Sequence, residues 1–357
     1  MNSKFFKIPL YLAYNFILVF VLIEIIFRML PVSNLKLMPV NEKNHIAHYS
    51  PNRIAFKQVG SNFKHISKKK INNFGYATDT DFIQDKLNKD KLIAIIGDSY
   101  VVAHQVSNQN AFHGIIKKDR NDLSIYPIAV NGAPLSQYLA FADFALDNFN
   151  PSTFIFVINE NDFDESWDSI KGSPGFYYFT DYGDLKLKHY ELSPLKSFLR
   201  KSAFIRYLIV DLQIHLQIKI FYENLFTIDQ NLEINFKEKE NNKIEILGTK
   251  AAKIFLKKID EMSLDKNIIV IVDGDRNSIY SNKFERDKTK LFNSWFEIII
   301  MNLKNHQKIK LIDMHPIFFE DWQKNYIKFN YDYDFHWNEY GHAIVADTLI
   351  SAINEIN

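Results

Sequence analysis

The sequence of 357 residues contains no cysteine, which excludes disulfide bonds, a thiolate nucleophile and any metal site built on cysteine. An excess of one charge is lacking as well, because 43 lysine and arginine residues face 42 aspartate and glutamate residues. The resulting net charge of +1 gives no electrostatic reason to expect nucleic acid as a partner. Hydrophobic residues make up 47% of the chain, which is ample for one large domain or two smaller ones.

One long apolar run is present, at the N-terminus. Residues 8–27 contain only two polar interruptions, Asn15 and Glu24, and about 20 apolar residues span a bilayer as a helix. Two lysines precede the run, and no small-x-small cleavage site follows it. We therefore expect residues 1–30 to be an uncleaved signal anchor in the inner (cytoplasmic) membrane, with the rest of the chain on the extracytoplasmic side. A cleaved secretory signal and a buried core helix are the alternatives.

Residues 31–88 are polar and weakly periodic, and we interpret them as a linker and a preceding segment that packs on the main domain. Strands and helices alternate from about residue 91 onward, so residues 89–357 are predicted to form the main domain. The predicted strands are 91–97, 124–130, 153–158, 267–272 and 309–313, and the predicted helices are 109–119, 134–148, 248–264, 284–304 and 338–355. This order predicts a three-layer α/β/α sandwich with a five-stranded, doubly wound parallel sheet of the flavodoxin-like type.

Residues 163–247 interrupt the alternation. The stretch 195–226 within them is strongly apolar with scattered basic residues. Such a segment could cap the site, lie on a membrane surface, or form a helical insertion packed on the core.

The first predicted strand ends in Gly97, and Asp98 and Ser99 follow it. Ligands bind at the carboxyl edge of open α/β sheets, where a serine can attack a substrate if a base and an oxyanion site stand nearby. Taken alone, Gly97-Asp98-Ser99-Tyr100 is more typical of an ordinary strand-to-turn exit than of a catalytic serine. Partner residues do occur downstream. A second buried strand precedes Asn161, and Asp334 and His336 stand just before the last predicted helix.

The order of these motifs resembles the SGNH (GDSL-type) hydrolase superfamily over roughly residues 90–355. Gly97-Asp98-Ser99-Tyr100 matches the first block of that family, and Asn161-Asp162 matches the end of its third block, with Asn159 in the usual glycine position. Asp334 and His336 match the last block. The resemblance implies that Ser99 is the nucleophile, His336 the base and Asp334 the orienting acid.

Two departures from the family pattern concern the acid and the second block. The usual Asp-x-x-His spacing would put the acid at Tyr333, whereas the acids here are Asp334 and Asp332. Members that resemble this chain often have Asp-x-His-Trp-Asn, which favours Asp334.

In the second block, Ser136 occupies the usual glycine position. The resemblance implies an oxyanion hole made by the backbone N–H of Ser99, that of Ser136 or, as runner-up, Gly132, and the side-chain amide of Asn161.

Four further residues are candidates for substrate binding: Asp98, Asp275, Arg276 and Trp337. Arg276 follows another predicted strand and could bind a carboxylate or a sugar acid, although a structural turn is the favoured interpretation. Trp337 could stack on substrate or pack in the core. A zinc site made by His336, His342 and a carboxylate is disfavoured, because the two histidines lack the i, i+4 spacing. We therefore expect neither a metal nor another cofactor.

The sequence favours a serine-dependent acyl ester hydrolase or O-acyltransferase that forms an acyl-enzyme. Members that combine an N-terminal anchor with Asp-x-His-Trp-Asn resemble proteins of polysaccharide acylation, so the expected substrate is an acylated, and more narrowly an O-acetylated, envelope or exported polysaccharide. The expected partners are this substrate, the membrane and a membrane-bound acyltransferase. The alternative is a non-catalytic, membrane-anchored protein that binds glycan or partners an acyltransferase.

Overall fold

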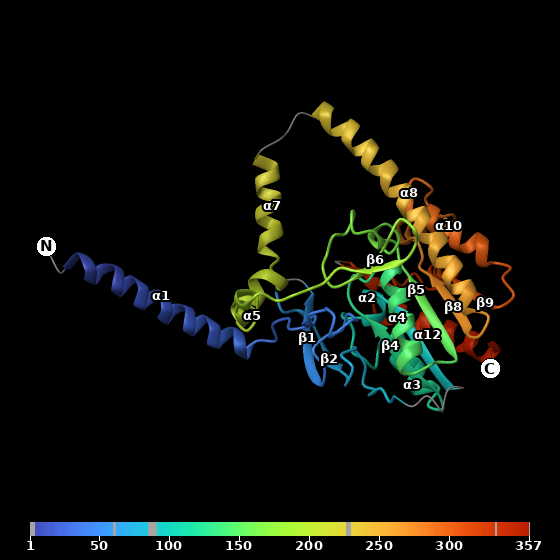
Figure 1. Ribbon diagram of the computed structural model, residues 1–357, viewed down its shortest axis with the longest axis horizontal. Helices are drawn as coiled ribbons and strands as arrows, with labels where there is room; N and C mark the ends of the chain where they lie inside the picture. The colour runs from blue at the N-terminus through green and yellow to red at the C-terminus, as the bar shows by residue number, and fades with distance from the viewer. Residues whose placement is uncertain (1–3, 60–61, 85–90, 226–229, 333, 357) are drawn as a thin grey trace. The chain divides into compact units, whose positions relative to one another are not determined.

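A computed structural model describes residues 4–59, 62–84, 91–225, 230–332 and 334–356. Its centre is a five-stranded sheet in the order β4-β3-β5-β8-β9, and every neighbouring pair is parallel. The strands are β3 (Leu92–Gly97), β4 (Ser124–Ala129), β5 (Thr153–Ile158), β8 (Asn267–Val272) and β9 (Ile309–Asp313). The predicted fold class is therefore confirmed (Figure 1).

The strands form because their sequences are short apolar runs that suit burial on both faces. Every residue of β3 and β5 is buried. Two groups of helices supply the outer layers. One group pairs α3 (Phe112–Asp119) with α12 (Glu339–Ile356), and the other joins α4 (Leu135–Asn148), α8 (Gln230–Met262) and α10 (Leu291–Leu303).

Two predicted helices differ most from the structure in where they begin. Helix α8 begins at Gln230 rather than at 248, and α10 begins at Leu291 rather than at 284. Further short elements have no counterpart in the prediction. They are α2 (Ser99–Val102), α9 (Arg276–Tyr280), α11 (Met314–Asn325), the hairpin strands β1 (Arg53–Val59) and β2 (His65–Ile71), β6 (Tyr177–Phe179) with β7 (Leu185–Leu187), and β10 (Asn330–Tyr331) with β11 (Asp334–Trp337).

The chain divides into two compact units, and the sheet belongs to the one made of residues 36–54, 69–191 and 229–357. The other unit comprises residues 1–35, 55–68 and 192–228. It contains α1 (Lys4–Met29), α5 (Pro194–Leu199), α6 (Ala203–Arg206), a π-helical turn η3 (Tyr207–Asp211) and α7 (Ile214–Leu225). The boundaries predicted at residues 30 and 88, and for the insertion 163–247, stay predictions.

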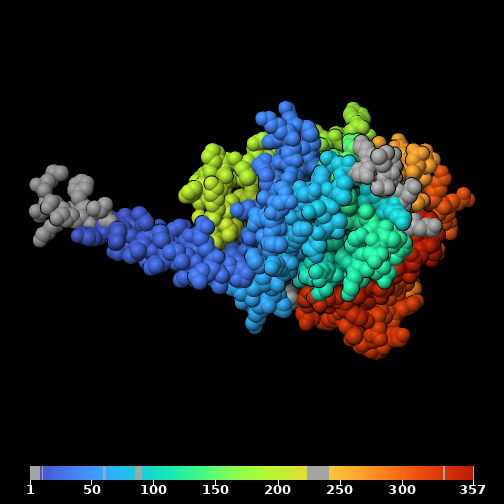
Figure 2. Space-filling model, turned by 90° about the horizontal axis from the view of Figure 1, so that it is seen from below, coloured from blue at the N-terminus to red at the C-terminus, as the bar shows by residue number. Residues whose placement is uncertain are grey.

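Helix α1 is long and apolar enough to cross a membrane. Its span Tyr11–Met29 has a mean hydropathy of 2.1, and none of it is buried within the structure. Figure 2 shows much of the span 11–29 at the surface, in blue. The segment therefore has the length and exposure expected of a single-pass anchor.

Candidate active site

Ser99 is positioned by a tight turn at the carboxyl end of β3. A Cβ atom on Gly97 would lie 2.4 Å from Cγ2 of Val101, so only glycine lets α2 fold back directly over the end of the strand. Asp98 then caps α2, because its carboxyl accepts a hydrogen bond from the backbone N–H of Tyr100 at 2.9 Å. The turn places Ser99 at the first position of the helix, where it is half-buried.

The structure brings Ser99, His336 and Asp334 together. Nε2 of His336 lies 2.7 Å from Oγ of Ser99. Nδ1 of the same imidazole forms a hydrogen bond with Oδ1 of Asp334, which also accepts from the backbone N–H of His336 at 2.9 Å. The His336 side chain is 24% exposed, so a substrate can reach it. This is the contact pattern of a nucleophile, a base and a group that orients the base.

Asp334 is held as a carboxylate by its surroundings. Burial alone would raise its pKa, but hydrogen bonds from His336 and from Nε2 of Gln105, at 2.8 Å, hold the pKa well below the usual value for aspartate. A fixed negative charge at this place stabilises the imidazolium that forms when His336 takes a proton. Sequence reasoning missed Gln105, since a lone glutamine after a short helix carries no motif.

The other acid considered from the sequence, Asp332, is not part of this arrangement. Its side chain is 80% exposed, and it pairs with Lys328 at 2.6 Å. Tyr333, the position of the acid in the usual family spacing, lies outside the described residues. The geometry therefore favours Asp334.

Two of the predicted oxyanion donors follow the strands that flank β3. Gly132 comes after β4 and Asn161 comes after β5, and these strands pair with β3 on either side. Gly132 adopts a φ of +69° that favours glycine. Within the described residues, neither the Gly132 N–H nor the Asn161 side chain donates a hydrogen bond, and both residues are partly exposed. Both residues thus lie at the carboxyl edge of the sheet, where Ser99 lies, and remain candidates for the oxyanion site.

Ser136 is placed differently from the prediction. It is completely buried, its backbone N–H donates to Oγ of Ser166 at 3.1 Å, and its own Oγ donates to the carbonyl of Tyr177 at 2.7 Å. The physical reason is that Ser136 lies in the first turn of α4, whose N–H groups have no partner within the helix. Ser166 Oγ accepts a hydrogen bond from the Ser136 N–H, so this N–H is not free to stabilise an oxyanion, and Gly132 stays the candidate backbone donor.

Asp98 also differs from the prediction, because it faces inward and not toward a substrate. It is 1% exposed, and its carboxyl accepts from Nδ2 of Asn159 at 2.9 Å. Its Oδ2 lies 3.0 Å from Oγ of Ser99, and the Ser99 N–H interacts with the same carboxyl. Burial raises the pKa of Asp98. Asn159, the residue in the family's glycine position, thus helps to hold the group behind the nucleophile.

The other three residues predicted to contact substrate, Trp337, Arg276 and Asp275, are buried and bonded to other protein groups. Trp337 is completely buried and its Nε1–H donates to Asp273 at 3.1 Å. Arg276, 8% exposed, donates to the same carboxylate at 2.7 Å. Asp275 is 3% exposed and pairs with Lys290 at 3.0 Å. The physical reason is that buried charges require partners, and here protein groups supply them. These three side chains therefore support the edge of the sheet from behind.

His342 packs in the core. It is 1% exposed, its Nδ1 accepts from the backbone N–H of Phe112 at 3.4 Å, and burial lowers its pKa well below the usual value. Within the described residues, no three histidine or acidic side chains are grouped as metal ligands.

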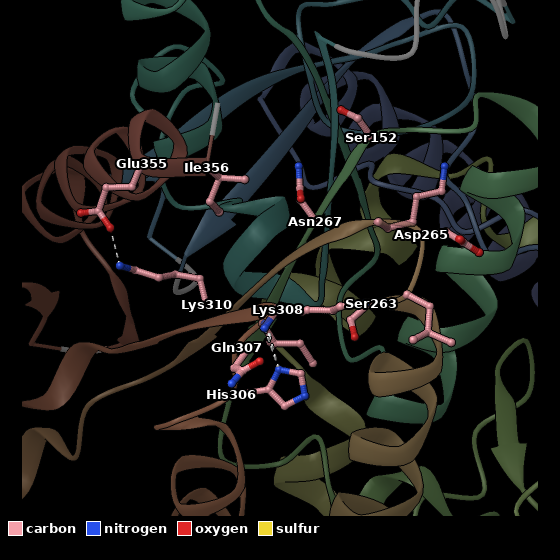
Figure 3. A pocket seen from close by; sticks show the side chains of 13 residues that line it. Ser152, Ser263, Asp265, Asn267, His306, Gln307, Lys308, Lys310, Glu355 and Ile356 are labelled. Carbon is pink, nitrogen blue, oxygen red and sulfur yellow. Dashed lines mark hydrogen bonds and ion pairs between the residues drawn. The ribbon is translucent and has the colours of Figure 1, made fainter.

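A second set of serine, histidine and aspartate lies at the opposite, amino edge of the sheet. Ser152 and His306 line a pocket there, which is shown in Figure 3. Nε2 of His306 lies 3.0 Å from Asp260, but its Nδ1 accepts from the backbone N–H groups of Lys308 and Ile309. Ser152 donates to the carbonyl of Leu92. Both imidazole nitrogens are therefore engaged away from the serine.

No family model matches the sequence, and comparison with curated proteins gives no match. Solved structures do show similarity. A lipolytic protein of the G-D-S-L family from Veillonella parvula is 12% identical, with a TM-score of 0.40 over 74% of this chain and 98% of its own. The acetyl xylan esterase AlAXEase is 15% identical, with a TM-score of 0.41 over 73% and 99%. The acetylxylan esterase Axe2 from Geobacillus stearothermophilus, as a catalytic mutant, is 10% identical, with a TM-score of 0.38 over 75% and 96%.

The resemblance to the SGNH hydrolases rests on the sequence motifs around Ser99, Asn161 and His336. Because the similarities are distant, the function proposed below rests on the geometry of the site and on the motifs.

Proposed function

We propose that the protein is a serine-dependent enzyme of acyl ester chemistry, with Ser99 as nucleophile. The observation that carries this proposal is the continuous contact from Ser99 Oγ through the imidazole of His336 to Asp334. A serine hydroxyl is a weak nucleophile until a base takes its proton. Here a base is in hydrogen-bonding distance, and a carboxylate fixes its orientation.

In the first half of the proposed reaction, Nε2 of His336 takes the hydroxyl proton while Oγ of Ser99 attacks the ester carbonyl carbon. The carbonyl oxygen becomes an oxyanion, which the Gly132 N–H and the Asn161 amide would stabilise. The tetrahedral intermediate then expels the alcohol, which receives the proton from His336. The product is an acyl-enzyme on Ser99.

In the second half, the direction depends on what attacks the acyl-enzyme. Water attack gives hydrolysis, and attack by a sugar hydroxyl gives O-acyl transfer, while His336 activates either one. From the resemblance, we propose that the acyl group is carried by an envelope or exported polysaccharide and that acetyl is the group. The anchor motif further suggests a position on the extracytoplasmic face of the inner membrane, beside a membrane-bound acyltransferase. A reporter fused after Asn357 that works only outside the cytoplasm tests the orientation.

The decisive experiment uses the full chain purified in detergent. With p-nitrophenyl acetate, we expect turnover and, by mass spectrometry, one acetyl group on Ser99. Ser99→Ala should abolish both, lowering the rate on the order of 10⁵-fold, whereas the matched variant Ser152→Ala should be unaffected. Acetylated polysaccharide with and without an acceptor sugar then separates hydrolysis from transfer. If the wild type shows neither turnover nor acetylation on any acetyl ester, the non-catalytic glycan-binding alternative replaces this proposal.

A further inference from the structure

One face of α1 packs against the segment that follows α5. Phe20, Glu24 and Phe27 recur at the spacing of a single helix face. The ring of Phe204 in α6 lies 6.1 Å from that of Phe20 and 5.2 Å from that of Phe27, and Tyr207 lies 4.7 Å from Phe27. Phe20 is the central residue of the span Tyr11–Met29. A segment that touches both Phe20 and Phe27 therefore lies beside the second half of the membrane span.

Glu24 supplies the polar contacts that such a segment needs. Its carboxylate accepts from Oγ of Ser202 and from the backbone N–H groups of Ala203, at 2.9 Å, and Phe204, at 3.1 Å. Glu24 lies five residues before Met29, hence about 7.5 Å along the helix from the end of the span. Backbone N–H groups at membrane depth must find hydrogen-bond acceptors within the protein. Glu24, the sole acid of the span, accepts from the N–H groups of Ala203 and Phe204. The polar residue that interrupts the anchor thus has a structural reason to be there.

The elements joined to α6 expose large apolar side chains. In α5, Leu195 is 66% and Phe198 is 70% exposed. In α7, Ile214, Ile218 and Phe221 share one helix face and are exposed by 39%, 50% and 61%. Exposed apolar area on this scale marks an interaction surface.

Basic residues accompany these apolar side chains. Arg28, at the end of α1, pairs with Glu24 at 2.8 Å and donates to the carbonyl of Lys201 at 3.3 Å. Lys196 and Arg200 lie in and just after α5, and Arg206 ends α6. An interfacial segment combines apolar side chains in the acyl boundary with lysine and arginine among the headgroups.

We propose that residues 194–222 form an interfacial membrane segment, docked on α1, whose partner is the lipid bilayer. Lipid, rather than another protein, is favoured by continuity, since α6 contacts the same part of α1 that a bilayer would surround. The basic residues favour anionic headgroups. This proposal does not depend on the proposed enzymatic activity.

The absence of native cysteine makes a direct test possible. Single variants Phe198→Cys and Ile218→Cys, with Lys219→Cys as the matched control on the same helix, would carry an environment-sensitive fluorophore. The full chain is then reconstituted in vesicles of phosphatidylcholine with a minority of phosphatidylglycerol. We expect lipid-attached quenchers to act about twofold or more strongly at positions 198 and 218 than at 219, and aqueous iodide to show the reverse order.

Equal quenching by iodide at all three positions would overturn the proposal. Labels that are open to iodide in vesicles but shielded in native membranes would also overturn it, because the surface would then belong to a protein partner. The esterase assay on the same preparations reports independently on the proposed function.

Discussion

The two edges of the central sheet carry the same three residue types, and only one edge arranges them for chemistry. At the carboxyl edge, the imidazole of His336 bridges Ser99 and Asp334. At the amino edge, His306 pairs with Asp260, yet its second nitrogen is occupied by backbone N–H groups.

The two edges differ in how the backbone positions these side chains. The parallel strands β3, β4 and β5 all end at the carboxyl edge, so the turns that follow them converge there, each with a polar residue. At the amino edge, the His306 ring terminates its own turn by accepting from Lys308 and Ile309, and Ser152 joins its strand to β3 through Leu92. Composition alone therefore does not distinguish a site from a turn.

The largest expected effect comes from removing the two histidines in turn. His336→Ala should lower acyl ester turnover on the order of 10⁵-fold, and the double variant with Ser99→Ala should be little worse, because the pair acts as a unit. His306→Ala should leave turnover unchanged. Steady-state kinetics with p-nitrophenyl acetate measures this. Comparable losses for both histidines would show that the contrast between the edges is wrong.

A smaller loss is expected from the acid. Asp334→Asn should lower turnover by about 10³–10⁴-fold, because the imidazole remains but loses its fixed tautomer and the charge that stabilises its cation. Asp332→Asn, at an exposed position two residues away, should be mild. The same kinetic assay applies. If Asp332→Asn were the crippling change, the acid would be misassigned.

Much of the fold could be predicted because the five strands are short and predominantly apolar, and each predicted strand lies within one residue of the observed one. The first and last residues of the helices were harder to predict from the sequence. The polar residues at the start of α8 carry no apolar stripe, and Pro316 inside the first turn of α11 obscured that helix, although proline is tolerated there.

The site could be predicted where a sequence motif fixes the local backbone. It could not be predicted where hydrogen bonds between distant residues determine the position of a side chain. Ser99, Asp334 and His336 are brought together as the motifs suggested. For Ser136 the spacing was correct, but nothing in the sequence showed that Ser166 takes its N–H. Likewise, Trp337 beside the base suggested stacking on substrate, whereas Asp273 draws its indole into the core.

The oxyanion donors provide the third test of the carboxyl edge. Asn161→Ala should lower turnover by about 10²–10³-fold, with little change in thermal stability, because the half-exposed amide has no structural partner in the described residues. Ser136→Gly, which removes only a hydroxyl bonded to Tyr177, should retain most of the activity while lowering the melting temperature. A large loss of rate in Ser136→Gly would show that the hydroxyl of Ser136, and not only its backbone, contributes to the site.

The smallest expected effect concerns the buried carboxyl behind the nucleophile, and it appears in stability rather than in rate. Burial raises the pKa of Asp98 above its ordinary value of about 3.9. The folded state therefore binds this proton more tightly than the unfolded state, so the contribution of Asp98 to stability is greatest below about pH 4 and is lost as pH rises.

Asp98→Asn removes this titration and keeps an acceptor for the Tyr100 N–H. The stability difference between wild type and variant, measured by urea unfolding of the full chain, should consequently shrink between about pH 4 and pH 8. The amide can still donate to Oγ of Ser99, which leaves the serine proton for His336, so activity should fall by about tenfold at most. A difference in stability that is constant with pH would mean that Asp98 titrates alike in both states, and burial behind Ser99 would then not disfavour its charge.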